Sequence, residues 1–306
     1  MKRALITGIC GQDGTYLAEL LLAKDYEVHG LTRQGDDKLP ANLKSHVAIH
    51  YGDLADDASI KRAMNDAAPD EVYHLAGQSK VFGFADDDYT LNVNGTLSVL
   101  EAAFDRAQKP RVFYAASSEI FGVVETLPAN EETPINPINT YAKAKAFGYQ
   151  TMKSYRARGL FGCSGILFNH ESPRRGDFVT QKIAKSVAAI AAKKEDALEL
   201  GDLDARRDWG FAGDYVDAMW RMLQAEQPDD YVIATGESHS VREFCDIAFK
   251  HVGLDYRDYV EISSNLVRDN EIKETRGDAS KAARVLGWKP KVGFEELVHM
   301  MVDAHR

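Results

Sequence analysis

Four residues near the middle of the chain have side chains suited to acid and base chemistry. Ser117 and Glu119 come at the end of an apolar run that begins at Ala115, and Tyr141 and Lys145 follow after a loop. Because Tyr141 and Lys145 are four residues apart, a helix places them one turn apart on the same side. An ammonium group beside a phenol favours the phenolate and lowers a pKa that is ordinarily about 10. The pattern predicts a tyrosine base, a hydroxyl and a carboxylate around one pocket.

A glycine-rich turn at the start of the chain predicts a nucleotide cofactor next to that pocket. The apolar strand 3–7 leads into Gly8, Gly11 and Gly14, and residues 15–24 have a helical pattern. Glycines at such a turn let the backbone approach a pyrophosphate, which then faces the helix N-terminus. The spacing is G-x-x-G-x-x-G, and its position between a strand and a helix gives it this meaning.

The second strand indicates which cofactor is preferred. It spans residues 27–33 and ends at Thr32 and Arg33, where sites for NAD usually carry an Asp or Glu that holds the ribose hydroxyls. A guanidinium group suits the phosphate that NADP carries on its 2′-hydroxyl. The sequence therefore favours NADP over NAD.

Strands and helices alternate along the first half of the chain. Further strands are expected at 47–51, 71–75, 111–115 and 165–168, with helices between them. This alternation predicts an α/β fold with a Rossmann-type, doubly wound parallel sheet, followed by a smaller, mixed α/β C-terminal domain. Ligands bind outside the carboxyl ends of such strands, which is where Ser117 and Glu119 come. The acidic run 86–88 is expected to be a solvated turn.

The composition argues against several classes of function. The 306 residues carry a formal net charge of −10, so neither a broad nucleic-acid surface nor an anionic-membrane surface is expected. A run of about 18 apolar residues, which a membrane span needs, does not occur. The three cysteines are far apart and form no C-x-x-C pair. We therefore expect no metal site, no disulfide framework and a location in the reducing cytoplasm.

Five basic residues stand out against this acidic average. They are Arg174, Arg175, Lys182, Arg207 and Arg268. If they converge in the fold, they would form a pocket for a diphosphate. They come from three separate segments, so their convergence is a prediction about the fold.

Longer motifs give the chain a family resemblance. The run Asn169-His-Glu-Ser-Pro-Arg-Arg-Gly176 is far more specific than the glycine turn or the Tyr/Lys pair, and the runs 201–210 and 286–290 add to it. With these motifs the chain resembles the extended short-chain dehydrogenases/reductases, and within them it is most similar to the GDP-mannose 4,6-dehydratase family. The resemblance covers nearly the whole chain.

The resemblance implies a dehydration that begins and ends with hydride transfer. Tyr141, held by Lys145, would remove the proton of the sugar C4 hydroxyl while hydride passes to NADP, and Ser117 would polarise the C4 oxygen. Glu119 would take the C5 proton and assist the loss of water from C6, after which NADPH returns the hydride to C6. A GDP-sugar would become a 4-keto-6-deoxy sugar nucleotide, and the cofactor would be regenerated.

The resemblance also implies binding residues and a division into domains. The cofactor would be bound by Gly8, Ile9, Cys10, Gly11, Gln12, Asp13, Gly14, Arg33, Asp53, Leu54, Leu75, Ala76, Gly77, Gln78, Ser79, Tyr89, Lys145, His170 and Arg175. The nucleotide sugar would be bound by Asn169, Val179, Lys182, Arg207, Arg268 and Glu271. The NADP-binding Rossmann domain would comprise residues 1–168 and about 208–236, and the nucleotide-sugar-binding domain about 169–207 and 237–306.

The chain departs from the family pattern at several positions. Ser117 stands where the family's catalytic hydroxyl is usually a threonine, and the segment 80–85 is bulkier and one residue shorter than the family's sugar-contacting run. The run 268–273 keeps the family's Arg and Glu and loses the rest. The short loop 34–38 replaces a long loop that builds tetramers in the family. We therefore expect a homodimer through the two-helix face that includes the Tyr141 helix.

Two other functions stay open at this point. A reductase or epimerase of a GDP-4-keto-6-deoxy sugar would use the same Tyr141 and Lys145, although a reductase consumes NADPH stoichiometrically. A non-catalytic NADP-sensing protein on the same fold typically lacks the Tyr or the Lys, whereas this chain keeps both.

Overall fold

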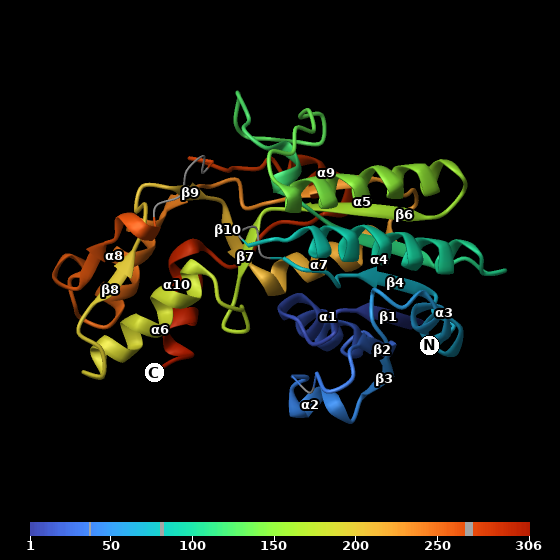
Figure 1. Ribbon diagram of the computed structural model, residues 1–306, viewed down its shortest axis with the longest axis horizontal. Coiled ribbons are helices and arrows are strands. Elements are labelled where there is room, and N and C mark those ends of the chain that lie inside the picture. Colours follow the sequence, from blue (N-terminus) through green and yellow to red (C-terminus); the bar gives the residue numbers. More distant parts are fainter. Residues whose placement is uncertain (37, 80–82, 267–271) are drawn as a thin grey trace.

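A seven-stranded parallel sheet forms the centre of the structure, which is a computed structural model that describes residues 1–36, 38–79, 83–266 and 272–306 (Figure 1). The strand order is β11-β6-β5-β4-β1-β2-β3, and every neighbouring pair is parallel. The first six strands of the chain therefore have the 3-2-1-4-5-6 order of a doubly wound sheet. The predicted fold class is confirmed.

The sheet and the helices packed with it account for most of the helical and strand residues. The strands are β1 (Arg3–Thr7), β2 (Glu27–Thr32), β3 (Val47–Tyr51), β4 (Glu71–His74), β5 (Arg111–Ser117), β6 (Gly162–Leu167) and β11 (Asp230–Ile233). The helices are α1 (Gln12–Leu22), α2 (Ala41–Lys44), α3 (Asp57–Ala67), α4 (Asp86–Phe104), α5 (Thr140–Ala157), α7 (Ala212–Gln224), α9 (Ser280–Leu286) and the short 3₁₀ helix η1 (Ser118–Phe121).

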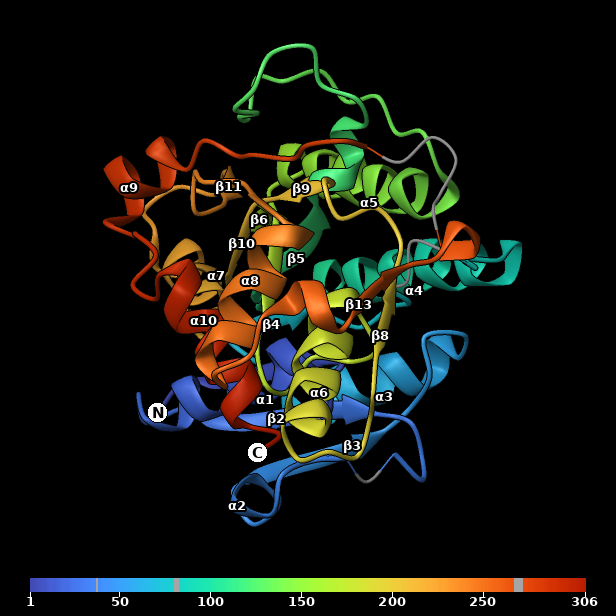
Figure 2. The ribbon, with the colours of Figure 1, turned by 90° about the vertical axis from the view of Figure 1, so that its left-hand side faces the viewer.

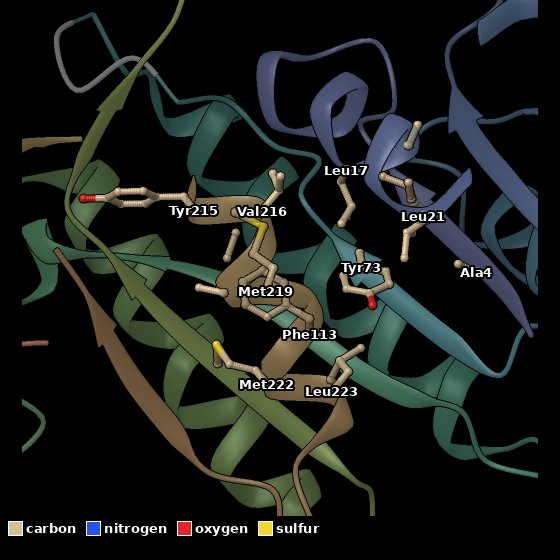
Figure 3. Packing of buried hydrophobic residues seen from close by; sticks show 14 of the residues in the cluster. Ala4, Leu17, Leu21, Tyr73, Phe113, Tyr215, Val216, Met219, Met222 and Leu223 are labelled. Atoms are coloured by element: carbon tan, nitrogen blue, oxygen red, sulfur yellow. The ribbon is translucent and has the colours of Figure 1, made fainter. Parts of the chain in front are cut away.

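Helices cover both faces of the sheet, because successive strand residues face opposite sides. On one face, Leu21 of α1 and Met219 of α7 pack against Tyr73 and Phe113 of the sheet (Figure 3). On the other face, α3, α4 and α5 pack against the alternate strand residues, such as Val72. Here α4 and α5 lie side by side (Figure 1). Burial on both faces explains why the strands are almost continuously apolar.

A smaller group of elements lies at one end of the molecule, on the left in Figure 1. Figure 2 shows the molecule with this end toward the viewer. It comprises β7 (Asn169–Glu171), α6 (Val179–Ala191), β8 (Leu198–Leu200), β9 (Arg206–Arg207), β10 (Trp209–Phe211), β12 (His239–Ser240), α8 (Val241–His251), η2 (Tyr256–Asp258), β13 (Val260–Ile262), η3 (Ser264–Leu266) and α10 (Phe294–Asp303). Its own apolar core includes Trp209 and residues of α6, α8 and α10. The segment 280–288, by contrast, packs into the core of the sheet through Ala282 and Trp288. The predicted domain division stays a prediction, and we propose that 280–288 belongs with the sheet.

The acidic run 86–88 is solvent-exposed at Asp86 and Asp87, as the sequence predicted, but it is part of a helix rather than a loop turn. Its three aspartates form the first turn of α4, where negative side chains are stabilised by the positive end of the helix dipole. The side chain of Asp88 also accepts a hydrogen bond from the backbone N–H of Ala85, the residue that precedes the helix. Within the described part of the chain, no helix is both long and apolar enough to span a membrane.

The buried carboxylate of Asp208 holds together the segments that connect the sheet to the smaller group. It accepts hydrogen bonds from the backbone N–H groups of Thr235, Gly236 and Gly277, at 2.8, 3.0 and 3.2 Å, and from the Thr235 hydroxyl at 2.7 Å. The Asp208 carboxylate thus fixes the chain directly after β11 and near residue 277, where the buried N–H of Gly277 would be costly without an acceptor.

We expect Asp208→Ala to lower the free energy of unfolding by about 3 kcal/mol, because three backbone N–H groups lose their common acceptor and the one of Gly277 is buried. Urea denaturation measures this loss. Asp204→Ala is the matched control, since the Asp204 side chain is 75% exposed, and it should change stability by less than about 0.5 kcal/mol. Equal effects of the two substitutions would contradict the assigned role of Asp208.

Candidate active site

The glycine turn between β1 and α1 borders a cavity of about 310 Å³. Gly8 has a φ of +74°, and a Cβ at this position would lie 2.9 Å from the backbone nitrogen of Ala76. A Cβ on Gly14 would lie 2.4 Å from the carbonyl oxygen of Gly8. Only glycine allows this close approach of turn and helix, and the resulting helix N-terminus is suited to an anion. The surroundings of the cavity therefore fit the phosphates of a dinucleotide.

Most of the residues predicted to bind the cofactor line this cavity, among them Arg33 and Arg175. Within the described residues, the lining does not include four of the predicted ones: Ile9, Tyr89, Lys145 and His170. The side chain of Ile9 is buried in the core instead. Five further residues line the cavity without having been assigned from the sequence: Leu31, Thr32, Asp36, Gly52 and Leu91. Three of these, Leu31, Thr32 and Gly52, are at the carboxyl ends of β2 and β3. Because ligands bind at the carboxyl ends of parallel strands, these three could have been predicted from the sequence.

A buried histidine supports the loop that follows β4. His74 Nδ1 lies 2.8 Å from the Thr7 hydroxyl, and His74 Nε2 lies 3.2 Å from the Thr96 hydroxyl. Burial, with a smaller contribution from the charge of Lys145, lowers the pKa of His74 to about 3, so the ring is neutral. The Thr7 hydroxyl in turn accepts a hydrogen bond from the backbone N–H of Ala76 at 3.1 Å. The wall of the cavity is thus tied to β1.

Asn92 of α4 fixes the same loop from the other side. Its Oδ1 accepts a hydrogen bond from the backbone N–H of Gln78 at 2.9 Å, and its Nδ2 donates to the carbonyl of Gln78 at 3.0 Å. The Asn92 side chain thereby pairs with both backbone groups of Gln78, as a neighbouring β-strand would. No sequence signal distinguishes Asn92 from other polar helix residues, and its role was missed.

The glycine turn is joined to the motif Asn169–Gly176 by a set of hydrogen bonds. Gln12 Oε1 accepts from the Ser172 hydroxyl at 2.7 Å, and Gln12 Nε2 donates to the carbonyl of His170 at 3.1 Å. His170 Nε2 lies 2.9 Å from Asp13 Oδ2. The specific motif is therefore packed directly against the turn, and from it Arg175 reaches the cavity wall.

His170 is held in its charged form. Its Nδ1 lies 2.8 Å from the carbonyl oxygen of Phe168 and its Nε2 faces the Asp13 carboxylate. Both partners are acceptors, so both ring nitrogens carry hydrogen. Burial opposes this charge, but Asp13 outweighs it and raises the pKa of His170. Burial likewise opposes the charge of Asp13, whose pKa is nevertheless lowered by His170 and Arg175.

The four predicted catalytic residues meet where β5 ends and α5 begins. Ser117 is the last residue of β5, and its hydroxyl accepts a hydrogen bond from the backbone N–H of Glu119 at 3.3 Å. Glu119 is half-buried in η1. Tyr141 is 7% exposed in the first turn of α5, and it is hydrogen-bonded to Ser117 and close to the charge of Glu119. The predicted grouping of hydroxyl, carboxylate and phenol is therefore present.

The expected effect of Lys145 on Tyr141 was wrong for this geometry. The Lys145 ammonium donates a hydrogen bond to the carbonyl of Ala115 at 2.8 Å and lies 5.9 Å from the centre of the Tyr141 ring. Burial raises the pKa of Tyr141 to about 12, against an opposing hydrogen bond from Ser117. Burial also lowers the pKa of Lys145 to about 8. Desolvation, which the spacing argument left out, outweighs the charge of the lysine.

Phe84 lies against the predicted base. Its ring meets the Tyr141 ring edge to face, with centroids 5.5 Å apart. It belongs to the segment 80–85, in which the sequence departs from the family pattern. Residues 80–82 of that segment lie outside the described residues.

The residues predicted to bind the nucleotide sugar are spread over the smaller group of elements. Asn169 is in β7, Val179 and Lys182 are in the first turns of α6, and Arg207 is in β9. The Lys182 ammonium donates to the carbonyl of Glu199 at 2.6 Å. Arg268 and Glu271 lie outside the described residues. The sugar site therefore stays a prediction.

The predicted convergence of five basic residues was wrong for Arg174. Its guanidinium donates to Glu19 Oε1 at 2.8 Å and stacks over the Tyr16 ring at 4.0 Å. Both partners are in α1, so Arg174 fastens the motif to this helix, whereas the adjacent Arg175 lines the cavity.

Comparisons with known proteins identify the family. The sequence matches the family model described as GDP-mannose 4,6 dehydratase over residues 5–301. GDP-mannose 4,6 dehydratase 1 of Arabidopsis thaliana is 50% identical over 322 residues, which cover 99% of this chain and 89% of that protein. The human GDP-mannose 4,6 dehydratase is 43% identical over 336 residues, which cover 98% of this chain and 90% of that protein.

Solved structures agree with the fold. The UDP-glucose 4-epimerase of Thermus thermophilus, in complex with NAD, is 27% identical with a TM-score of 0.87, and the match covers 99% of this chain and 98% of that one. The sheet, the glycine turn and the Tyr141/Lys145 pair define an extended short-chain dehydrogenase/reductase. Within that class, the chain belongs to the GDP-mannose 4,6-dehydratase family.

The ion pair of Asp13 and His170 predicts a stability contribution that depends on pH. The pKa of His170 is raised in the folded protein from its ordinary 6.5, and that of Asp13 is lowered from its ordinary 3.8. The contribution is therefore complete between about these two values. It is lost as the pH rises through the raised pKa of His170 or falls through the lowered pKa of Asp13.

We accordingly expect His170→Gln to lower the melting temperature more within that window than at alkaline pH. The exposed His46 provides the control, and His46→Gln should leave the melting temperature unchanged. A deficit of His170→Gln that is the same at all pH values would contradict the charged pair.

Proposed function

We propose that this protein is a GDP-mannose 4,6-dehydratase that uses NADP. The observation that carries the proposal is the carboxylate of Glu119 at the beginning of α5, where it accepts a hydrogen bond from Asn139, two residues before Tyr141. Simple hydride transfer needs an acid or base only at the oxygen attached to the carbon that is oxidised or reduced. A second group near the same point is required when a carbon-bound proton is also removed.

The chain's own residues supply the proton transfers. A nicotinamide cofactor held by the residues that line the cavity, among them Arg33 and Arg175, would supply the hydride chemistry at C4 and C6. Tyr141 removes the C4 hydroxyl proton, and the Ser117 hydroxyl donates a hydrogen bond to the C4 oxygen. The resulting ketone acidifies the C5 proton, which the Glu119 carboxylate takes. Glu119 then gives that proton to the departing C6 oxygen, so that the C6–O bond breaks and water leaves.

Mass spectrometry of the product tests the proposal directly. Incubation of the protein with GDP-mannose and a catalytic amount of NADP should give a nucleotide sugar that is lighter by one water, with no net consumption of cofactor. Tyr141→Phe should abolish conversion and still bind NADP, because it removes only the proton acceptor. Stoichiometric oxidation of NADPH with a keto-sugar would instead indicate a reductase, and absence of any conversion of GDP-mannose would refute the proposal.

The preference for NADP rests on Arg33. It is exposed at the end of β2 and lines the cavity, so its guanidinium can pair with a 2′-phosphate. Asp36 lines the same cavity and is hydrogen-bonded to Arg33 through the backbone, with Asp36 N donating to Arg33 O at 3.1 Å. A carboxylate here favours ribose hydroxyls over a phosphate, so Arg33 has to outweigh it.

We expect Arg33→Ala to weaken NADP binding about tenfold or more and NAD binding little, since only NADP presents the phosphate. Fluorescence titration with both reduced cofactors measures the two affinities. Arg62→Ala is the control, because this arginine is 64% exposed on α3 and does not line the cavity. An equal loss for both cofactors would count against a contact with the 2′-phosphate.

Substrate binding and assembly are also part of the proposal. Asn169, Val179, Lys182 and Arg207 would contact the GDP-sugar from β7, α6 and β9. A homodimer would form through the adjacent helices α4 and α5, which lie side by side on one face of the sheet (Figure 1). The cytoplasm stays the expected compartment.

A further inference from the structure

Asn139, the residue that precedes α5, makes two side-chain hydrogen bonds that join the beginning of this helix to the candidate acid/base. Its Oδ1 accepts from the backbone N–H of Ala142 at 2.7 Å, which caps the helix. Its Nδ2 donates to Glu119 Oε2 at 3.1 Å. The same residue thus contacts the helix that carries Tyr141 and the carboxylate that lies next to it.

The orientation of the Asn139 amide is determined by its surroundings. The backbone N–H of Ala142 is a donor, so the atom that faces it has to be the amide oxygen, and the amide nitrogen then faces Glu119. Serine, threonine and aspartate also cap helices. Serine and threonine have one short hydroxyl for both tasks, and aspartate has no donor. Among the good capping residues, only asparagine can accept from the helix and donate to the carboxylate at the same time.

We propose that Asn139 is a positioning residue that holds Glu119 in place for proton transfer at C5, an inference that rests on the role proposed above for Glu119. Fixing Oε2 leaves Oε1 free to take the C5 proton. The C5–H electron pair then forms the C5–C6 double bond, the C6–O bond breaks, and the proton leaves with that oxygen as water. Asn139 itself touches no reacting atom.

The Glu119 side chain needs a contact that fixes its position, because of where it lies in the fold. The side chain is half-buried on a short 3₁₀ helix of four residues, and a glutamate there has several rotamers to choose from. A donated hydrogen bond selects one rotamer and fixes where the carboxylate lies. Because Tyr141 is two residues after Asn139, the proton acceptors for C4 and C5 are both positioned from one amide, which reduces the variation in distance between them.

The substitution Asn139→Ser separates the capping of α5 from the hydrogen bond to Glu119. Asn139→Ser keeps a good helix cap and removes the donor to Glu119. We expect the holoenzyme of this variant to have the wild-type melting temperature and KM for GDP-mannose, with kcat reduced about tenfold to a hundredfold. The kinetic isotope effect with C5-deuterated substrate should rise, because the C5 step becomes more rate-limiting. Asn139→Ala, which loses both contacts, should reduce kcat similarly and lower the melting temperature as well.

Two results would overturn the inference. One is a wild-type kcat in Asn139→Ser. The other is a reduced kcat with an unchanged isotope effect, which would mean that the substitution acts on another step. Failure of the wild-type protein to dehydrate GDP-mannose would refute the proposed function instead.

A measurement on the protein without substrate distinguishes a failure of the Asn139 inference from a failure of the proposed function. The side-chain amide protons of Asn139, observed by NMR in the ¹⁵N-labelled protein, should lie downfield in the wild type and move upfield in Glu119→Ala. Asn130 supplies the reference, since its side chain is bonded to the backbone of Glu132 and not to Glu119, and its amide signals should not move. Unchanged Asn139 signals would overturn the contact, whatever the substrate.

Discussion

The buried ion pair between Asp13 and His170 is the contact on which the arrangement of the site depends. Asp13 is in the first turn of α1, at the positive end of the helix dipole. His170 is fixed on its other side by the carbonyl of Phe168 and by stacking on Tyr215 of α7, with ring centres 4.6 Å apart. The pair therefore joins the glycine turn to two elements far away in sequence. Arg175 enters the cavity from the segment that this pair holds.

Desolvation governs the chemistry at the other end of the site. Burial raises the pKa of Tyr141 to about 12 and lowers that of Lys145 to about 8. Both shifts have one cause, the cost of a charge in a pocket that excludes water. The phenol is thus neutral near neutral pH and has to give up its own proton before it accepts one from the substrate. A hydrogen bond donated by Ser117 favours that loss in the protein without substrate. The hydroxyl has only one hydrogen, so it has to turn from the phenol to the C4 oxygen when the sugar is bound.

The parts of this structure that the sequence predicted well are those set by local patterns. The strand–glycine–helix pattern located the cavity, and the i,i+4 spacing put Tyr141 and Lys145 on one helix. The contacts that were missed join residues far apart in the chain. Asn92 resembles any polar helix residue in the sequence and Asn139 any residue that caps a helix, and only the fold gives them Gln78 and Glu119 as partners. The charge of Arg174 also did not predict its partner, because its guanidinium pairs with Glu19 of α1 and not with the other basic residues around a diphosphate pocket.

Differences from the family pattern gather around the phenol. Phe84 covers the edge of the Tyr141 ring, and it belongs to a segment that is shorter and bulkier than the family's sugar-contacting run. An apolar neighbour excludes water from the reacting atoms, which strengthens every remaining electrostatic interaction there. It also offers the sugar no hydrogen bond. With no polar partner from Phe84, the position of the Glu119 carboxylate near the beginning of α5 is set by protein contacts such as its hydrogen bond with Asn139.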